Sequence, residues 1–273
     1  MNQSLNWEFV APLFVPGNRP ERFEKAAASG ADAIIIDLED AVPAEAKEAA
    51  RAALRAGFTD LPVLVRINAA GTKWHLDDLN AVSQMPFAGV ILPKAELSAE
   101  LISLVEARRA VFPHVVALVE TGRGLADARE IAKLDGIRRL AFGSIDFCAD
   151  MGCAHTREVL LSARSELVLA SRLAGKIAPI DGVTTAIDDA TAVTEDARHA
   201  SEFGFGGKLC IHPRQVPHVL AGFRPETHEI AWAERVLSSG DGAAAVDGQM
   251  VDEPVRVRAR SILLRGAPRS DSV

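Results

Sequence analysis

Short apolar runs recur along this chain, and five of them end in, or just before, a charged residue. The charged residues are Asp37 after AIII, Arg66 after PVLV, Lys94 after GVILP, Glu120 after VVALV and Asp146 after LAFGSI. Continuous apolar runs of this length are typical of parallel strands that are buried on both faces. Charges that recur at strand ends indicate a parallel barrel whose carboxyl-end rim carries chemistry.

Eight runs of strand type alternate with segments of helical periodicity. The runs cover residues 10–15, 33–38, 62–67, 88–93, 114–120, 138–143, 176–183 and 207–213. Eight strands that alternate with helices in a chain of 273 residues predict an α/β fold, a (β/α)8 TIM barrel. A doubly wound sheet is the alternative, but the turn after the first run, VPGNRPE, lacks the Gly-rich pattern of that fold.

The pattern changes after the eighth run. Residues 1–220 are expected to form the catalytic barrel, and residues 221–273 a C-terminal helical extension that includes a Gly-, Ala- and Asp-rich loop at 240–254. Asp252 lies in this loop together with other acids, and from the pattern alone a solvated surface loop accounts for them.

Composition and charge argue against several classes of protein. The net charge is −7 and the chain has no block of Lys or Arg, so we expect no nucleic-acid partner. No apolar run approaches the roughly 20 residues that span a bilayer, and the first residues lack the pattern of a signal peptide. The three cysteines fit a reducing compartment. We therefore expect a cytoplasmic protein without a membrane partner.

Glu120 and Asp146 are the candidate metal ligands. They lie at the ends of neighbouring predicted strands, about 5 Å apart, so both carboxylates can reach one ion. Oxygen ligands favour Mg²⁺ or Mn²⁺, with water and substrate in the remaining coordination positions. The alternative is that each acid caps a helix or forms a salt bridge.

Arg66 ends an apolar run and needs an anionic partner, because burying an unpaired guanidinium is costly. It can bind a substrate carboxylate through two parallel hydrogen bonds, form an ion pair with Glu39 or Asp40, or do both. The acids Asp37, Glu39 and Asp40 follow the second run. They are expected to hold waters around a metal, to orient Arg66, or to cap the next helix.

Three further polar residues lie near the predicted rim. Arg19 and Lys25 flank the start of the first predicted helix and could meet phosphates, although an exposed Lys is ordinarily only solvated. His212 ends the last run. The pattern does not distinguish between a histidine packed at the rim and a histidine that contacts substrate.

Several segments together resemble one family, the citrate lyase β-subunit-like proteins of the class II aldolase, malyl-CoA lyase and citrate lyase group. These segments are FVPGNRPE, DLEDAV, VRINAAGT, ALVETGRG, AFGSIDF, IHPRQV and GQMVDEP. The resemblance covers about residues 14–254. It implies a (β/α)8 barrel with Mg²⁺, which Mn²⁺ could replace. It also implies a homo-oligomer, a trimer or a dimer of trimers, with the C-terminal extension at the subunit interface.

The resemblance also implies roles for individual residues. Glu120 and Asp146 fall on the metal ligands, and Arg66 on the catalytic arginine that holds the carboxylate of a 2-oxo acid. Asp252 falls on a catalytic acid that reaches a neighbouring subunit's site and handles the proton on the acyl α-carbon. Ile145 stands where many relatives carry a second acid. The implied substrate contacts are Phe14, Arg19, Lys25, Arg66, Glu120, Ile211 and His212.

The activity that the resemblance implies is Mg²⁺-dependent cleavage of a carbon–carbon bond. The substrate would be a 3-hydroxy-3-carboxyacyl-CoA (citramalyl-, malyl- or citryl-CoA), and the products acetyl-CoA and a 2-oxo acid. One alternative is an acyl-CoA thioesterase. Another is the β subunit of a multi-subunit citrate lyase that acts on an acyl-carrier-protein thioester. A barrel that only binds acyl-CoA is disfavoured, because the set of candidate catalytic residues is intact.

Overall fold

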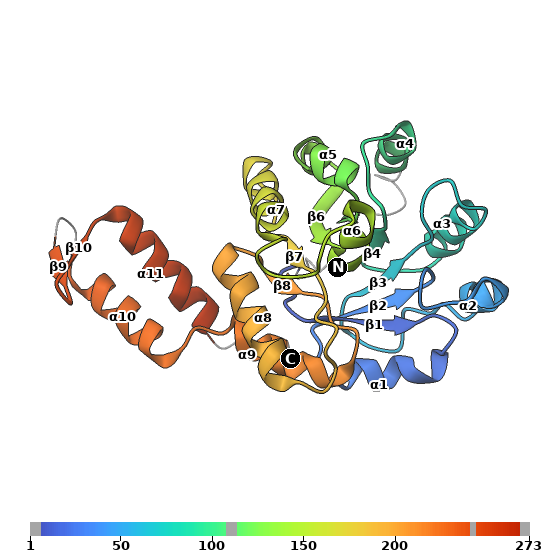
Figure 1. The fold of residues 1–273 in the computed structure, drawn as a ribbon. Helices are drawn as coiled ribbons and strands as arrows, with labels where there is room; N and C mark the ends of the chain where they lie inside the picture. Colours follow the sequence, from blue (N-terminus) through green and yellow to red (C-terminus); the bar gives the residue numbers. More distant parts are fainter. Residues whose placement is uncertain (1–6, 108–113, 241–243, 268–273) are drawn as a thin grey trace.

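The structure, a computed structural model, describes residues 7–107, 114–240 and 244–267. Eight parallel strands follow one another in chain order around a barrel, with helices on the outside (Figure 1). Backbone hydrogen bonds between the last and first strand segments close it. Lys208 N donates to Val10 O at 2.8 Å, and Phe14 N donates to Cys210 O at 2.9 Å. The predicted (β/α)8 barrel is confirmed.

The strands follow the predicted runs closely, except that the last two are much shorter. They are β1 (Pro12–Pro16), β2 (Ala33–Asp37), β3 (Val63–Arg66), β4 (Gly89–Leu92), β5 (Val115–Val119), β6 (Ile137–Phe142), β7 (Ile180–Asp181) and β8 (Gly207–Lys208).

Nine α-helices accompany the strands of the described barrel. They are α1 (Phe23–Ala27), α2 (Lys47–Ala52), α3 (His75–Ser83), α4 (Ala99–Ala107), α5 (Gly122–Lys133), α6 (Ser144–Met151), α7 (Leu161–Leu173), α8 (Ala190–Phe203) and α9 (Val216–Phe223). The sequence pattern does not predict α3, α6 or α9. The helix α6 begins directly after the end of β6, so its sequence reads as a continuation of the strand segment.

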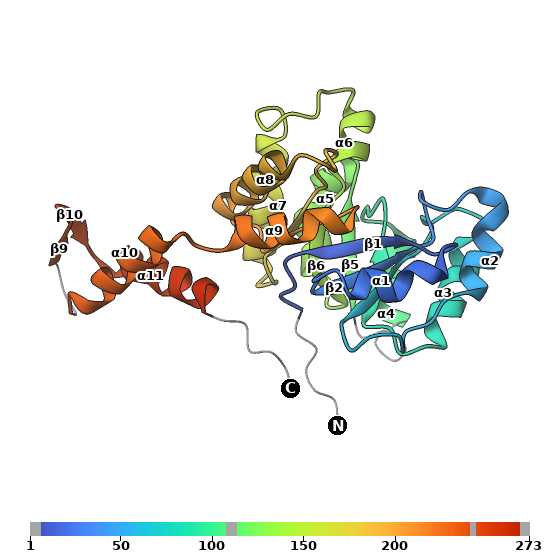
Figure 2. The ribbon, with the colours of Figure 1, turned by 90° about the horizontal axis from the view of Figure 1, so that it is seen from below.

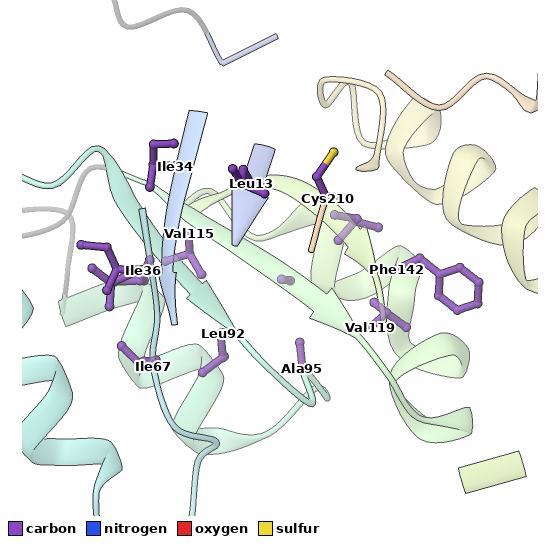
Figure 3. Packing of buried hydrophobic residues seen from close by; sticks show 14 of the residues in the cluster. Leu13, Ile34, Ile36, Ile67, Leu92, Ala95, Val115, Val119, Phe142 and Cys210 are labelled. Carbon is purple, nitrogen blue, oxygen red and sulfur yellow. The ribbon is translucent and has the colours of Figure 1, made fainter. Parts of the chain in front are cut away.

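The two faces of each strand pack in different places. Outward-facing side chains such as Ile36 pack against the surrounding helices (Figure 3). Inward-facing side chains such as Ile35 and Leu118 form a second cluster inside the barrel. Side chains alternate along a strand with a period of two. Asp37 and Glu120 therefore continue the inward rows of Ile35 and Leu118 to the carboxyl-end mouth.

The last described residues form a C-terminal arm, residues 227–267, that extends away from the barrel (Figure 1, Figure 2). It consists of α10 (Thr227–Ser238), β9 (Ala244–Val246), β10 (Gln249–Val251) and α11 (Glu253–Gly266). The arm has a small core of its own, which contains Ala233, Val236, Val251, Ala259 and Ile262.

The segment predicted as a loop at 240–254 is only partly a loop. Strands β9 and β10 pair in an antiparallel hairpin, in which Val246 faces Gln249. The two residues between them, Asp247 and Gly248, have φ of 53° and 77°. Positive φ at both central positions is the preference of a two-residue hairpin turn, for which Asp-Gly is a strong signal. The sequence therefore carried this signal, and the loop prediction missed it.

The predicted boundary at residue 220 falls inside α9 (Val216–Phe223), which packs against α8. The arm begins later, with α10 at Thr227. The role of the extension in a subunit interface stays a prediction. Within the described ranges, no helix has the length and apolar character needed to cross a membrane.

Candidate active site

A cavity of about 400 Å³ opens among the strand ends at the mouth of the barrel. It is lined by Phe14, Pro16, Asp37, Asp40, Ala41, Arg66, Leu118, Glu120, Phe142, Gly143, Ser144, Ile145, Asp146, Val183, Leu209 and Ile211. The cavity thus brings together residues from the ends of strands across most of the barrel. This convergence is the arrangement expected of a barrel active site.

Arg66 lies among three carboxylates on this rim. Its Nε donates to Asp37 Oδ1 at 2.7 Å and its Nη2 to Asp37 Oδ2 at 2.6 Å. Its Nη1 lies 3.1 Å from Glu39 Oε2 and 3.4 Å from Asp40 Oδ2. Burial opposes the charge, but these carboxylates hold the pKa of Arg66 above its usual value. The predicted ion pair is confirmed, and Asp37 is its principal partner.

Asp37 is fixed from two sides. Besides its two hydrogen bonds with Arg66, its carboxylate accepts hydrogen bonds from the backbone N–H groups of Glu39 at 2.9 Å and Ala41 at 3.1 Å. The guanidinium of Arg66 also lies 4.9 Å from the centre of the Phe14 ring. Asp37 therefore orients Arg66. The next short helix begins after Pro43 without a side-chain cap, so the capping role predicted for these acids is wrong for that helix.

Lys94 connects the arginine cluster to the candidate metal ligands. Its Nζ donates to Glu39 Oε1 at 2.9 Å, while its backbone N–H donates to Glu120 Oε2 at 2.8 Å. The residue has a φ of 48°, an uncommon conformation for a side chain other than Gly. Burial raises the pKa of Glu39. The sequence marks Lys94 as a strand-end charge but indicates no role for it, because a backbone donor leaves no signature in the sequence.

Glu120 and Asp146 line the same cavity, as their positions on neighbouring strands predict. Glu120 is only 2% exposed, and Asp146 lies in the first turn of α6. A Cβ atom at Gly143 would lie 2.2 Å from Glu120 Cγ, so only glycine leaves room for the glutamate here. Burial, the charge of Glu39 and the charge of Asp146 raise the pKa of Glu120 to about 8.

These two residues fit a divalent cation. A buried carboxylate whose pKa is raised by neighbouring negative charges gains from a cation, which relieves that repulsion. The described part of the chain holds no cluster of three or more His, Cys, Asp or Glu residues with metal-binding geometry. The protein would then supply two carboxylates and leave the other positions to water and substrate, which is how Mg²⁺ is usually held.

Only some of the other residues predicted to contact substrate line the cavity. Phe14 and Ile211 line the cavity, whereas Arg19, Lys25 and His212 do not. Arg19 is exposed and pairs with Glu21 at 2.7 Å, and Lys25 is also exposed. The Nδ1 of His212 accepts the backbone N–H of Arg214 at 3.2 Å at the start of a short 3₁₀ helix. The contact of these three residues with substrate stays a prediction.

Asp252 lies on the arm and does not line the cavity of its own chain. Its side chain caps α11, with Oδ1 accepting the backbone N–H of Val255 at 3.3 Å, and the residue is exposed. Asp252 is the residue between β10 and α11, and both views of the fold show these two elements on the arm, away from the barrel (Figure 1, Figure 2).

The sequence pattern does not predict the apolar wall of the cavity. This wall includes Leu118, Phe142, Val183 and Leu209. Leu118 and Leu209 belong to the inward-facing cluster, two residues before Glu120 and Ile211. The period of two was therefore a usable signal, since it places such residues directly beneath the functional ones.

The fold and the site define a class: a (β/α)8 barrel with an acidic, arginine-centred cavity at its carboxyl-end mouth. Residues 11–213 match the model of the HpcH/HpaI aldolase/citrate lyase family, and the chain belongs to that family.

Named relatives agree with this assignment. A citrate lyase subunit beta-like protein of Mycobacterium tuberculosis is 42% identical over 268 residues, 93% of this chain and 94% of the relative. A (3S)-malyl-CoA thioesterase of Cereibacter sphaeroides is 32% identical over 94% of both chains. The structure of CitE from Mycobacterium tuberculosis in complex with magnesium, acetoacetate and coenzyme A has a TM-score of 0.85. It is 41% identical, covering 94% of this chain and 98% of its own.

Proposed function

We propose that the chain is a Mg²⁺-dependent carbon–carbon lyase. It cleaves a 3-hydroxy-3-carboxyacyl-CoA ester to acetyl-CoA and a 2-oxo acid, with citramalyl-, malyl- and citryl-CoA as candidate substrates. One observation carries the proposal: Arg66, Glu120 and Asp146 line a single cavity at the mouth of the barrel. The relative whose structure holds magnesium, acetoacetate and coenzyme A supports it.

Glu120 and Asp146 would hold the ion, with Mg²⁺ as the principal candidate and Mn²⁺ as a substitute. When bound, the ion supplies Lewis acidity toward the hydroxyl and carboxylate oxygens of the substrate. Gly143 leaves the space that Glu120 occupies, and the backbone N–H of Lys94 fixes Glu120 Oε2.

Arg66 binds the substrate carboxylate and fixes its orientation. A guanidinium has five N–H donors, and the hydrogen bonds to Asp37 and Asp40 use three of them. The remaining donors can face the cavity. Asp37 accepts hydrogen bonds from two nitrogens of the guanidinium, so the side chain of Arg66 is already oriented before substrate binds. This preorganisation favours the reacting geometry.

In the cleavage, the substrate hydroxyl gives its proton to water, and its carbon becomes the carbonyl carbon of the 2-oxo acid. The bond between this carbon and the acyl α-carbon breaks, and the electron pair moves to the α-carbon. A proton delivered to the α-carbon completes acetyl-CoA. We assign this delivery to Asp252 as a general acid.

Asp252 can serve this role only from a second copy of the chain. Asp252 is exposed and does not line the cavity of its own barrel, and it caps α11 of the arm that extends away from that barrel (Figure 1). Exposed apolar side chains on the arm, Met250, Val257 and Leu264, support burial against another subunit. A homo-oligomer, a trimer or a dimer of trimers, would bring the arm of one subunit to the cavity of the next.

Thioester hydrolysis is the second candidate activity, favoured by the similarity to the (3S)-malyl-CoA thioesterase. In that case water attacks the thioester carbonyl, the carbon–sulfur bond breaks, and free coenzyme A leaves with the hydroxy acid.

The test offers purified protein the three CoA esters with Mg²⁺ or with a chelator. Keto acid and free thiol are followed in the same reaction. The proposal expects Mg²⁺-dependent keto acid from the wild type and a loss of at least about 100-fold in Asp146→Asn. Asp135→Asn, outside the cavity, is the matched control. Full activity in a folded Asp146→Asn variant would refute the metal assignment. If neither keto acid nor free thiol formed from any of the three CoA esters, an acyl-carrier-protein thioester would be favoured as the substrate.

A further inference from the structure

The cavity has an uneven distribution of charge. Among the described residues that line it, Arg66 is the single cation, against the carboxylates of Asp37, Asp40, Glu120 and Asp146. Arg66 is already paired with Asp37 at 2.6 Å. A bound divalent ion and Arg66 together can accommodate one substrate carboxylate. A second carboxylate would meet acids without a further cation, and like charges in a partly buried site repel strongly.

The nearest lysines point elsewhere. Lys94 Nζ donates to Glu39 Oε1 at 2.9 Å, and Lys47 Nζ donates to the backbone carbonyls of Leu38 and Glu39 at 2.8 and 2.9 Å. Both lysines line a separate cavity of about 380 Å³. Neither ammonium group therefore provides a second anion site in the main cavity.

The wall beside the candidate metal ligand is apolar. Ile145 precedes Asp146 directly, lines the cavity and is 39% exposed. Val183, Leu209 and Ile211 continue this wall around the barrel. Such a surface favours an apolar substituent on the reacting carbon, because burying it removes apolar area from water.

We infer that the keto acid of this site carries one carboxylate and a methyl group on its carbonyl carbon, as pyruvate does, and that Ile145 determines this specificity. The inference rests on the proposed function and narrows its substrate class. It favours an ester whose hydroxyl-bearing carbon carries a methyl group. It disfavours an ester with a second carboxylate, which would release oxaloacetate.

Binding measurements test the inference without turnover. Isothermal titration of the Mg²⁺-loaded protein with pyruvate, glyoxylate and freshly prepared oxaloacetate compares methyl, hydrogen and carboxymethyl on the same carbonyl. We expect pyruvate to bind about 10-fold more tightly than glyoxylate, and at least about 10-fold more tightly than oxaloacetate. Equal or tighter binding of oxaloacetate, no preference over glyoxylate, or no binding by any of the three would overturn the inference.

Two variants separate Ile145 from general damage. Ile145→Ala is expected to reduce the preference for pyruvate over glyoxylate to less than about 3-fold, with glyoxylate binding unchanged. Ile102→Ala, at a similarly exposed residue of α4 outside the cavity, should keep the wild-type preference. If Ile145→Ala kept the wild-type preference for pyruvate over glyoxylate, Ile145 would not determine the specificity.

The inference and the proposed function fail in different ways. Selective binding of pyruvate without cleavage of any CoA ester would refute the lyase and leave the binding specificity in place. Cleavage of the esters with equal binding of pyruvate and oxaloacetate would keep the lyase and refute the specificity.

Discussion

The contact between Arg66 and Asp37 gives a prediction whose size can be worked out from the structure. The side chains are 11% and 2% exposed, and two charge-assisted hydrogen bonds of 2.7 and 2.6 Å join them. Removing one partner of a buried ion pair costs about 3–5 kcal/mol, because the other charge stays buried without compensation. Arg66→Met is therefore expected to lower the free energy of unfolding by about 3–4 kcal/mol.

A double-mutant cycle isolates the pair. Asp37→Asn is expected to cost about 2–3 kcal/mol, since Glu39 and Asp40 remain beside Arg66. The double variant should lose little more than Arg66→Met alone, which gives a coupling of about 2–3 kcal/mol. Urea unfolding followed by circular dichroism supplies the free energies of all four proteins.

The surface pair Arg129–Glu166 is a matched control. Its two hydrogen bonds are as short, 2.6 and 2.8 Å, but its side chains are 50% and 27% exposed. The same cycle with Arg129→Met and Glu166→Gln should give a coupling below about 1 kcal/mol. A coupling between Arg66 and Asp37 as small as that of the control pair would show that burial does not strengthen the ion pair.

Three further predictions follow from the site. Gly143→Ala should weaken Mg²⁺ binding at least about 10-fold in titration calorimetry, because the added Cβ meets Glu120. Gly57→Ala, where a Cβ meets no atom within 4 Å, should not. In Mg²⁺-free buffer, urea stability should fall as pH rises from about 4.5 to about 8. Folded Glu120 has a pKa of about 8 and binds its proton more tightly than the unfolded chain, and Glu120→Gln should flatten this slope. Mixed Glu120→Gln and Asp252→Asn proteins, each inactive alone, should recover about a quarter of the wild-type activity if Asp252 acts on a neighbouring subunit. No recovery after subunit exchange would contradict that role.

The sequence predicted the barrel because each buried strand is a continuous apolar run, and such runs are visible without tertiary information. It also predicted that Glu120 and Asp146 line one cavity, since the order of the strands places their carboxyl ends side by side. It could not predict that Lys94 fixes Glu120 through its backbone, or that Gly143 makes room for the glutamate. Both depend on packing between strands that are distant in sequence. The lengths of β7 and β8, which have two residues each, were overestimated because apolar residues continue past the hydrogen-bonded region.

The measurement that tests the lyase most directly identifies which bond breaks. A CoA ester whose hydroxyl-bearing carbon is labelled with ¹³C would be incubated with the protein and Mg²⁺, and the products followed by mass spectrometry. Cleavage of the carbon–carbon bond gives labelled 2-oxo acid together with unlabelled acetyl-CoA. Labelled hydroxy acid with free coenzyme A, and no acetyl-CoA, would contradict it and establish hydrolysis of the thioester instead.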